Sequence, residues 1–190
     1  MIKALLAMGK VDVNSKDTKY GQTPLLLAVE NGYEVVVKAL LAMGKVDVNS
    51  KDTKYGRTPQ SLAAEKGHEV VVKALLATGK VDVDFKDTKY GWMPSLLAAE
   101  NGHEVVVKAL LATGKVDIDS WTPPSWTPEN MREAVVKALL ATGKVDVDSK
   151  DTEYGRTPLL LAAGNGYEVV VKALLATGKV DVDSKDTEYG

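Results

Sequence analysis

Apolar and polar residues form two kinds of helical segment in this chain, and the stretch from Gly155 shows both. The first apolar run, LLLAA, follows Thr157-Pro158 and stops at Asn165-Gly166. A threonine side chain caps the free N–H groups at a helix start, proline is tolerated in the first turn, and glycine adopts the left-handed backbone that ends helices. This pattern predicts a short helix from Pro158 to near Asn165.

The second run, VVVKALLA, predicts another helix, which begins near Glu168 and continues to Gly178. A carboxylate in the first turn suits the helix macrodipole. Three consecutive valines are poor helix formers, so this helix depends on packing against its neighbours. The segment that follows, KVDVDSKDTEY, alternates only briefly and then contains Asp and Ser, which is typical of an extended arm with a tight turn.

The same pattern recurs along the sequence, mostly with a period of 35 residues. The string KALLA starts six times, at spacings of 35, 35, 35, 29 and 35 residues. Two short helices cannot cover their own apolar faces, so neighbouring units must stack into a continuous core, and we predict an all-α repeat solenoid. The starts are Lys3, Lys38, Lys73, Lys108, Lys137 and Lys172.

This period divides residues 1–190 into one array. We expect a half repeat at 1–20, repeats at 21–55, 56–90 and 91–119, an irregular repeat at 120–154 and a last repeat at 155–190. Solenoids normally carry polar capping repeats, and neither end of this array resembles one. Two explanations stay open: the chain is a fragment of a longer protein, or its uncapped ends self-associate.

Composition excludes several classes of protein. Apolar residues make up 45% of the chain and aromatic residues only 6%, so the core must consist of small aliphatic side chains. The chain has no cysteine, which excludes disulfides, thiolate metal sites and a cysteine nucleophile. No apolar run approaches the roughly 18 residues of a membrane span, and the start MIKALLAMGK lacks the features of a signal peptide. We therefore expect an intracellular, cytoplasmic protein with no membrane partner.

The charges also narrow the range of partners. The 24 basic and 26 acidic residues nearly cancel, which argues against a nucleic-acid partner. The balance hides an asymmetry, because residues 1–95 carry 14 basic and 11 acidic side chains whereas residues 96–190 carry 10 and 15. If the chain self-associates, this asymmetry favours head-to-tail contacts.

The segments GQTPL at 21–25, AAEKGH at 63–68 and VVVKALL at 70–76 resemble the ankyrin repeat pattern, G-x-T-P-L-x-x-A-A-x-x-G-H followed by V-V-x-x-L-L. The unit here is longer than the family's usual repeat of about 33 residues, and with ATGKVDVDSKD it resembles a variant frequent in filamentous fungi. The resemblance implies an ankyrin-type stack of helix pairs with short hairpin arms. It also implies a non-enzymatic scaffold that holds a protein partner on its hairpin tips and inner (first) helices, as in the sensor arrays of larger fungal signalling receptors.

Several positions depart from the family pattern. The leucine after the proline is replaced at Gln60, Ser95 and Pro124. If these positions are buried, as the resemblance implies, each loses apolar burial worth about 1.5–3 kcal/mol, so the middle repeats should be the least stable. The family's histidine in T-P-L-H, which bonds the threonine, is also absent, so we expect that network to be missing. Its position is occupied by Leu26, Ser61, Leu96, Ser125 and Leu160.

Residues 120–131, SWTPPSWTPENM, break the repeat. If Thr122-Pro123 is the helix start, Pro128 falls inside the helix, at a cost of about 3 kcal/mol, and Met131 replaces the glycine that ends it. If Thr127-Pro128 is the start, the helix itself is deleted. Both alignments predict a broken or shortened inner helix, and the repeated SWTP is either a loop that a partner recognises or a tolerated deletion.

The sequence contains no convincing catalytic or metal site. His68 and His103 share their repeat position with Tyr33 and Tyr167, and a ligand or general base would not be exchanged for tyrosine, so we interpret them as packing residues at the start of the outer (second) helix. The repeated Asp pairs lack the spacing of a calcium loop, and Gly-Lys lacks the remainder of a phosphate-binding loop. We predict a protein that is not an enzyme and has no cofactor or metal.

Differences between nearly identical repeats mark candidate partner-binding residues. The residue after the tip glycine varies most, and aromatic and arginine side chains are typical anchors of interfaces. Phe85 replaces the serine of other repeats and lies near the third tip. We expect a solvent-facing patch centred on Phe85, Tyr90, Trp92 and Trp121, with neutral drift after duplication as the alternative. The residues at this repeat position are Gln22, Arg57, Trp92, Trp121 and Arg156.

The irregular segment gives a first testable prediction. Amide protons of residues 120–131 should exchange with solvent faster than those of the other inner helices, because a broken helix leaves backbone groups without stable hydrogen bonds. Hydrogen exchange followed by mass spectrometry measures this. Equal protection in this segment and in the other inner helices would contradict the prediction.

Overall fold

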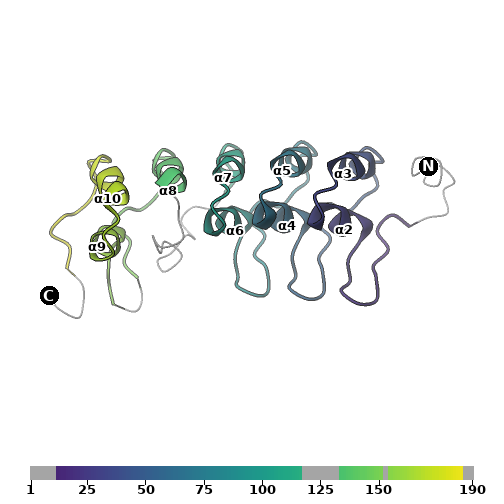
Figure 1. The fold of residues 1–190 in the computed structure, drawn as a ribbon, viewed down its shortest axis with the longest axis horizontal. Coiled ribbons are helices and arrows are strands. Elements are labelled where there is room, and N and C mark those ends of the chain that lie inside the picture. Colours follow the sequence, from purple (N-terminus) through teal and green to yellow (C-terminus); the bar gives the residue numbers. More distant parts are fainter. Residues whose placement is uncertain (1–11, 117–132, 152–153, 186–190) are drawn as a thin grey trace. The chain divides into compact units, whose positions relative to one another are not determined.

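Figure 1 shows the fold in a computed structural model, which describes residues 12–116, 133–151 and 154–185. The chain forms two compact units, Met1–Ala98 (unit 1) and Ala99–Gly190 (unit 2). Every regular element within the described ranges is an α-helix. This confirms the predicted all-α repeat fold, whereas the repeat boundaries stay a prediction.

In unit 1 the helices form an inner and an outer row (Figure 1). The inner helices α2 (Pro24–Glu30) and α4 (Pro59–Lys66) pack against each other, and so do the outer helices α3 (Glu34–Leu41) and α5 (Glu69–Leu76). Each inner helix also packs on the outer helix of its own repeat. A fifth helix, α6 (Pro94–Glu100), begins in unit 1 and ends in unit 2.

Unit 2 repeats this arrangement with one inner helix among its described residues. The outer helices are α7 (Glu104–Leu111), α8 (Glu133–Leu140) and α10 (Glu168–Leu175), and the inner helix is α9 (Pro158–Gly164). α9 packs on α10, and α8 contacts both α7 and α10. Residues 120–131, where the sequence predicts a broken helix, lie outside the described residues, as do Trp121 and Pro124.

Local sequence signals determine where the inner helices begin and end. The hydroxyl groups of Thr23, Thr58 and Thr157 each accept a hydrogen bond from the N–H three residues further on, and proline follows each of them. α4 is capped at its C-terminal end by Gly67, whose φ of 71° is left-handed. The predicted helix starts at Pro158 and Glu168 are confirmed. The second of these helices ends at Leu175 rather than near Gly178, because a turn follows at 176–177.

The arms between helix pairs contain turns and, within the described residues, no strand. Asparagine side chains connect one arm to the next instead. Asn14 donates through Nδ2 to the carbonyl of Lys45 at 3.0 Å and accepts through Oδ1 from the N–H of Asp47 at 2.8 Å. Asn49 makes the same two bonds one repeat later, to Lys80 and Asp82. Side chains therefore replace the backbone ladder that an extended arm would need.

Small aliphatic side chains form the core, as the composition indicates. In unit 1 the fully buried Leu62 and Leu75 belong to the inner and outer helix of one repeat, and Leu25 and Val37 have the same roles in the repeat before. The outer helices consist of EVVVKALL, in which only the valine and leucine positions that face neighbouring helices are buried. Packing therefore compensates for the low helix propensity of valine.

Two polar residues occupy the core position that Leu25 fills. Gln60 and Ser95 are both completely buried, which confirms that the replaced leucine positions lie in the core. Among the described residues, the Gln60 amide has no hydrogen-bond partner for its oxygen or its nitrogen, and the Ser95 hydroxyl has none either. Buried polar groups without partners destabilise a fold, which supports the prediction that the middle repeats are the least stable.

The threonine network is not entirely missing, contrary to the expectation from the sequence. The hydroxyl groups of Ser61 and Thr58 lie 3.0 Å apart, so Ser61 partly replaces the family's histidine. The Thr23 hydroxyl lies 3.2 Å from that of Ser50 in the following arm. Ser61 reaches Thr58 from the first turn of the same helix, whereas Ser50 reaches Thr23 from the arm that packs against it.

An aspartate anchors each hairpin tip. The Asp17 carboxylate accepts hydrogen bonds from the N–H groups of Lys19, Tyr20 and Gln22 at 2.7 to 2.8 Å. Asp52, Asp87 and Asp151 accept the corresponding tyrosine N–H in their own tips. These bonds close the tip and point the aspartate away from solvent.

Successive tips of unit 1 are joined to one another. The N–H of Thr53 donates to the carbonyl of Tyr20 at 2.8 Å, and the N–H of Thr88 donates to that of Tyr55 at 3.0 Å. Gly21 has a left-handed φ of 62°, and a Cβ there would lie 2.4 Å from the Thr53 side chain. Glycine is therefore required at this site both for the backbone and for the close approach of the next tip.

Replacing the buried amide tests its cost. Gln60→Leu should raise the free energy of unfolding by about 1–3 kcal/mol, because it removes polar atoms without partners and Leu25 shows that leucine fits this register. Urea unfolding followed by circular dichroism measures the change. The matched control is Gln22→Leu, which should lower stability because the Gln22 amide donates to Glu30 at 2.6 Å. If Gln22→Leu stabilised the protein and Gln60→Leu destabilised it, the conclusion that the Gln60 amide is a buried polar group without partners would be contradicted.

The tip aspartate predicts a pH dependence. The N–H of Tyr20, followed by those of Gln22 and Lys19, lowers the pKa of Asp17 below its ordinary 3.8 despite partial burial. A lowered pKa stabilises the fold above the unfolded-state value, and this contribution is lost as the pH falls through the folded-state value. Asp17→Asn should therefore be less stable than the wild type at about pH 7, and the difference should narrow at about pH 3. Thermal melts at both pH values decide, and a constant difference would argue against the charge.

Candidate functional site

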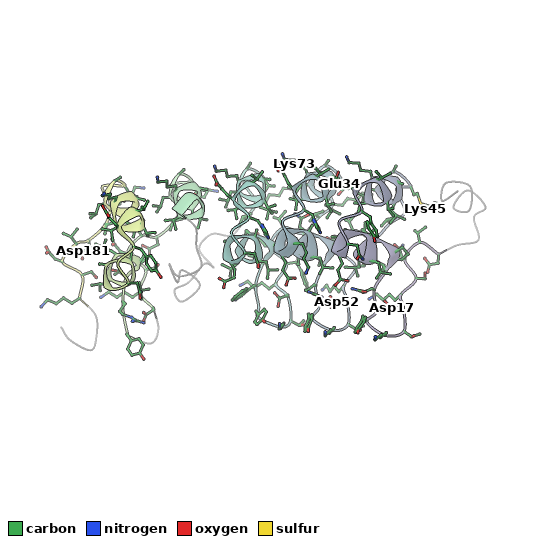
Figure 2. The ribbon with its side chains drawn as sticks, viewed as in Figure 1. Asp17, Glu34, Lys45, Asp52, Lys73 and Asp181 are labelled. Atoms are coloured by element: carbon green, nitrogen blue, oxygen red, sulfur yellow. The ribbon has the colours of Figure 1, made fainter. Side chains whose placement is uncertain are left out.

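The hairpin tips of unit 1 present aromatic rings to solvent. Figure 2 shows Asp17 and Asp52 in the loops at the inner-helix side, whereas Glu34 and Lys73 lie on the outer helices. Tyr20 is 38% exposed and Tyr90 is 54% exposed, and Tyr55 between them is half-buried. Because backbone hydrogen bonds join the tips, these rings have fixed places in the sequence of repeats.

Lysine side chains lie between the rings. The Nζ of Lys54 is 5.7 Å from the centre of the Tyr20 ring and 4.6 Å from that of Tyr55. The Nζ of Lys89 is 4.8 Å from the Tyr55 ring and 4.2 Å from the Tyr90 ring. Ammonium groups at this distance are attracted to the aromatic quadrupole. We call this alternation of Tyr20, Lys54, Tyr55, Lys89 and Tyr90 the tip row.

The contacts between lysine and tyrosine affect both partners. Interaction with the Tyr55 phenol raises the pKa of Lys54, and interaction with the Tyr90 phenol raises the pKa of Lys89. In return, Lys54 lowers the pKa of Tyr55. The lysines of the tip row are therefore fully charged at neutral pH.

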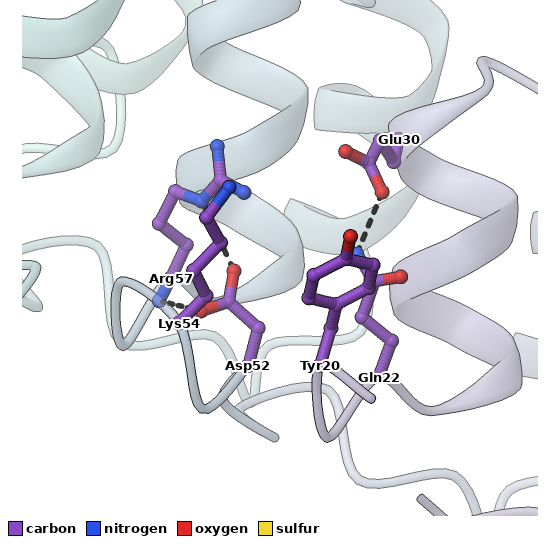
Figure 3. A pocket seen from close by; sticks show the side chains of 6 residues that line it. All are labelled: Tyr20, Gln22, Glu30, Asp52, Lys54 and Arg57. Carbon is purple, nitrogen blue, oxygen red and sulfur yellow. Dashed lines mark hydrogen bonds and ion pairs between the residues drawn. The ribbon is translucent and has the colours of Figure 1, made fainter. Parts of the chain in front are cut away.

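A hollow of about 210 Å³ lies beside the first two tips (Figure 3). Polar side chains line it, and two hydrogen-bonded pairs divide it: Gln22 with Glu30, and Arg57 with Asp52. The hollow is too polar for an apolar ligand and opens to solvent beside the tip row. Its lining residues are Tyr20, Gln22, Glu30, Asp52, Lys54 and Arg57.

Arg57 connects the second tip to its inner helix. Its Nε donates to Asp52 Oδ2 and its Nη1 to Glu65 Oε2, both at 3.0 Å. Partial burial lowers the pKa of Arg57, but these two carboxylates outweigh it and raise the pKa above its ordinary value. The guanidinium also lies 4.6 Å from the Tyr55 ring. This arginine is therefore held by two residues of its own tip, Asp52 and Tyr55, and by Glu65 on the inner helix that follows.

The third tip differs because Trp92 stands where Arg57 stands in the second. Without the guanidinium, Oδ2 of the buried Asp87 has no hydrogen-bond partner among the described residues. The indole lies instead against the exposed Tyr90, with ring centres 4.9 Å apart and planes tilted by 32°. The third tip therefore has an aromatic pair in place of an ion pair.

The structure places the other predicted site residues as follows. Gln22 is only 7% exposed, so the expectation that it faces solvent is wrong: its amide turns inward to Glu30. Phe85 is half-buried, with Lys51 Nζ 3.9 Å from its ring centre, rather than joined to the Tyr90 and Trp92 pair by a ring contact. In unit 2, Arg156 pairs with Asp151 at 3.0 Å and lies 4.4 Å from the Tyr154 ring. Trp121 lies outside the described residues.

Lys54 and Lys89 were missed as candidates from the sequence. A signal for them exists, since a lysine precedes the tip tyrosine at 19, 54 and 89, whereas glutamate does so at 153 and 188. A search for residues that vary between neighbouring repeats overlooks a feature that is constant through unit 1. The role of these lysines becomes visible only in their contacts with the tyrosine ring of the adjacent tip.

The two histidines occupy equivalent positions before outer helices, as predicted. His68 precedes α5, and its ring packs against Gly32, where an added Cβ would lie 2.8 Å from Cε1; His103 precedes α7. Over the described ranges, no three side chains of His, Asp or Glu gather as metal ligands. None of the helices in the same ranges is long and apolar enough to cross a membrane.

Comparisons with known proteins agree with this geometry. A family model described as ankyrin repeats (3 copies) matches residues 1–52, 36–122, 62–151 and 97–186. The solved structure titled "Crystal Structure of EF0377 an Ankyrin Repeat Protein" superimposes with a TM-score of 0.80 and 29% sequence identity, covering 92% of this chain and 89% of that one. The search of curated proteins returned no match. Since the family model covers nearly the whole sequence, this chain belongs to the ankyrin repeat family.

Proposed function

We propose that this chain is a non-enzymatic scaffold that holds a protein partner against the hairpin tips and inner helices of unit 1. Ankyrin repeats are in general protein interaction modules, which supports the class of function. The proposal adds the face and the residues: Tyr90 and Trp92 as aromatic anchors, with Arg57 and Phe85 beside them.

The observation that carries the proposal is that Trp92 occupies, in the third tip, the position that Arg57 occupies in the second. The tryptophan leaves a buried Asp87 oxygen without a partner among the described residues, although the neighbouring repeat shows how an arginine satisfies the same position. A buried acceptor without a partner costs about 1–3 kcal/mol. Sites that break a local rule of stability in this way are commonly functional. Tyrosine and tryptophan are also the residues that most often dominate binding energy at interfaces.

The chemistry of the tips supports binding rather than catalysis. Where a pKa is shifted among the described residues, the cause is a structural contact at a tip, such as the backbone N–H groups around Asp17 or the tyrosine beside Lys54. A catalytic site needs a nucleophile or base that is aligned with a second group. The hollow beside the first two tips holds carboxylates that are already paired with an arginine or an amide. The arrangement is therefore that of a preformed binding surface and not of a catalytic site.

Variants borrowed from other repeats test the proposal without disturbing the fold. Trp92→Arg combined with Phe85→Ser gives the third tip the residues found at Arg57 and Ser50 in the second. Affinity capture from a lysate of the source organism should recover a partner with the wild-type chain. The amount recovered with the double variant should be lower by about tenfold or more. Equal recovery by the two baits would refute the proposed face.

The stability of the variants separates binding from folding. Trp92→Arg gives Asp87 a partner but loses the aromatic pair, so its free energy of unfolding should stay within about 1 kcal/mol of the wild type. The matched control is Tyr33→His, which places the residue found at His68 on an exposed tyrosine before outer helix α3. This control should retain the partner. If it loses the partner as well, the outer side of the stack takes part in binding.

A further inference from the structure

The tip row of unit 1 carries exposed positive charge, and Glu65 is the carboxylate among the groups that raise the pKa of Lys89. Each tip exposes two lysines, one before the aspartate and one before the tyrosine, at 16 and 19, 51 and 54, and 86 and 89. The single aspartate of each tip turns inward to backbone N–H groups. Among the described residues, neither Lys54 nor Lys89 forms an ion pair.

The other carboxylates beside the tips already have partners. Glu30 accepts a hydrogen bond from Gln22, and Glu65 pairs with Arg57. Both lie in the last turns of inner helices α2 and α4, and their side chains reach the residue that follows the tip glycine. The face of unit 1 beside the hollow therefore presents exposed lysines, while its carboxylates are engaged within the fold.

Two of the lysines share one ring. The Nζ atoms of Lys54 and Lys89 lie 4.6 and 4.8 Å from the centre of the Tyr55 ring, which keeps them less than 10 Å apart. Two like charges at this separation repel each other, and an anion between or above them relieves the repulsion. Alternate side chains on one face of an extended peptide are roughly 7 Å apart, a spacing that lies within this upper limit.

We propose that the tip row binds an acidic, extended polypeptide segment of the partner, with Lys54 and Lys89 on its carboxylates and Tyr90 and Trp92 on its apolar side chains. The proposal rests on the proposed function and specifies the chemistry of the partner. Backbone hydrogen bonds between tips hold the lysines in register before binding, which reduces the ordering cost of the complex. The neighbouring tyrosines orient each ammonium, and because an ammonium has three N–H donors, donors remain for an acceptor beside the bond to Tyr55 or Tyr90.

The tip row favours a peptide over a nucleic acid or a membrane surface, because it combines a few lysines with aromatic rings. The charges are few and alternate with tyrosine rings, whereas a nucleic acid or an anionic membrane surface is typically bound by a denser cluster of basic residues. A second copy of this chain is the other acidic candidate, because residues 96–190 carry 15 acidic and 10 basic side chains.

The test uses charge reversals that the protein itself carries elsewhere. Lys54→Glu with Lys89→Glu installs the glutamate found before the tyrosine at 153 and 188. The control, Lys45→Glu with Lys80→Glu, makes the same change in charge at exposed lysines that follow outer helices α3 and α5. Fluorescence anisotropy with a labelled peptide of alternating Glu and Gly measures binding to the full chain, and a Gln and Gly peptide serves as the neutral probe.

We expect the acidic peptide to bind the wild type, to bind the tip variant roughly tenfold more weakly and the control variant within about twofold, and to weaken as salt rises. The neutral peptide should not bind. Absence of binding to the wild type, or equal weakening in both variants, would overturn the proposal. Tighter binding of a DNA duplex or of phosphatidylserine vesicles than of the peptide would overturn it too.

Two further measurements separate this inference from the proposed function and from self-association. If light scattering shows a dimer that Lys54→Glu with Lys89→Glu dissociates, the occupant is a second copy and the peptide proposal fails. If lysate capture succeeds and is lost with Trp92→Arg but not with the lysine reversals, the binding face stands and only the acidic chemistry is wrong. If nothing is captured while the acidic peptide binds as expected, the proposed function fails alone.

Discussion

The inward-turned aspartate of each hairpin tip is the interaction on which the rest of the surface depends. By accepting two or three hydrogen bonds from the tip's own backbone, Asp17 and its equivalents close a turn that has no strand pairing to hold it. The closed turn directs the tyrosine outward and brings the next tip close enough for a backbone hydrogen bond. It also turns the carboxylate toward the backbone, so in the described tips of unit 1 the carboxylate does not form an ion pair with the lysines on either side.

The residue five positions after this aspartate then gives each tip its individual character. Arg57 completes the carboxylate's hydrogen bonds and ties the tip to the inner helix, whereas Trp92 leaves one oxygen without a partner among the described residues and pairs with Tyr90. Gln22 is too short to do the first and too polar to do the second, so it turns to Glu30. One backbone frame thus supports an ion pair, an aromatic pair or a buried amide.

The core tolerates irregularities for a related reason. In a stacked repeat each helix pair contacts only its neighbours, so the cost of a poor core residue such as Gln60 stays within its own repeat and the next. The aliphatic positions around it, including Leu62 and Leu75, are fully buried and supply most of the stabilisation. A globular core with one centre would transmit the same defect to many more contacts.

The sequence by itself determined the helices, their caps and the repeat, because these depend on residues a few positions apart: a threonine and the N–H three residues on, or a glycine after the last turn. It also identified the leucine positions whose replacements, Gln60 and Ser95, are buried. Only the tertiary structure decided which variable residues face solvent, how Ser61 replaces a histidine, and that lysines and tyrosines alternate along the tips. The alternation arises from contacts between residues about one repeat apart, such as Tyr20 with Lys54, which meet only after the repeats have stacked. The burial of Gln22 and the contact of Ser61 with Thr58 are shorter in range, but they depend on side-chain orientations that a sequence pattern does not specify.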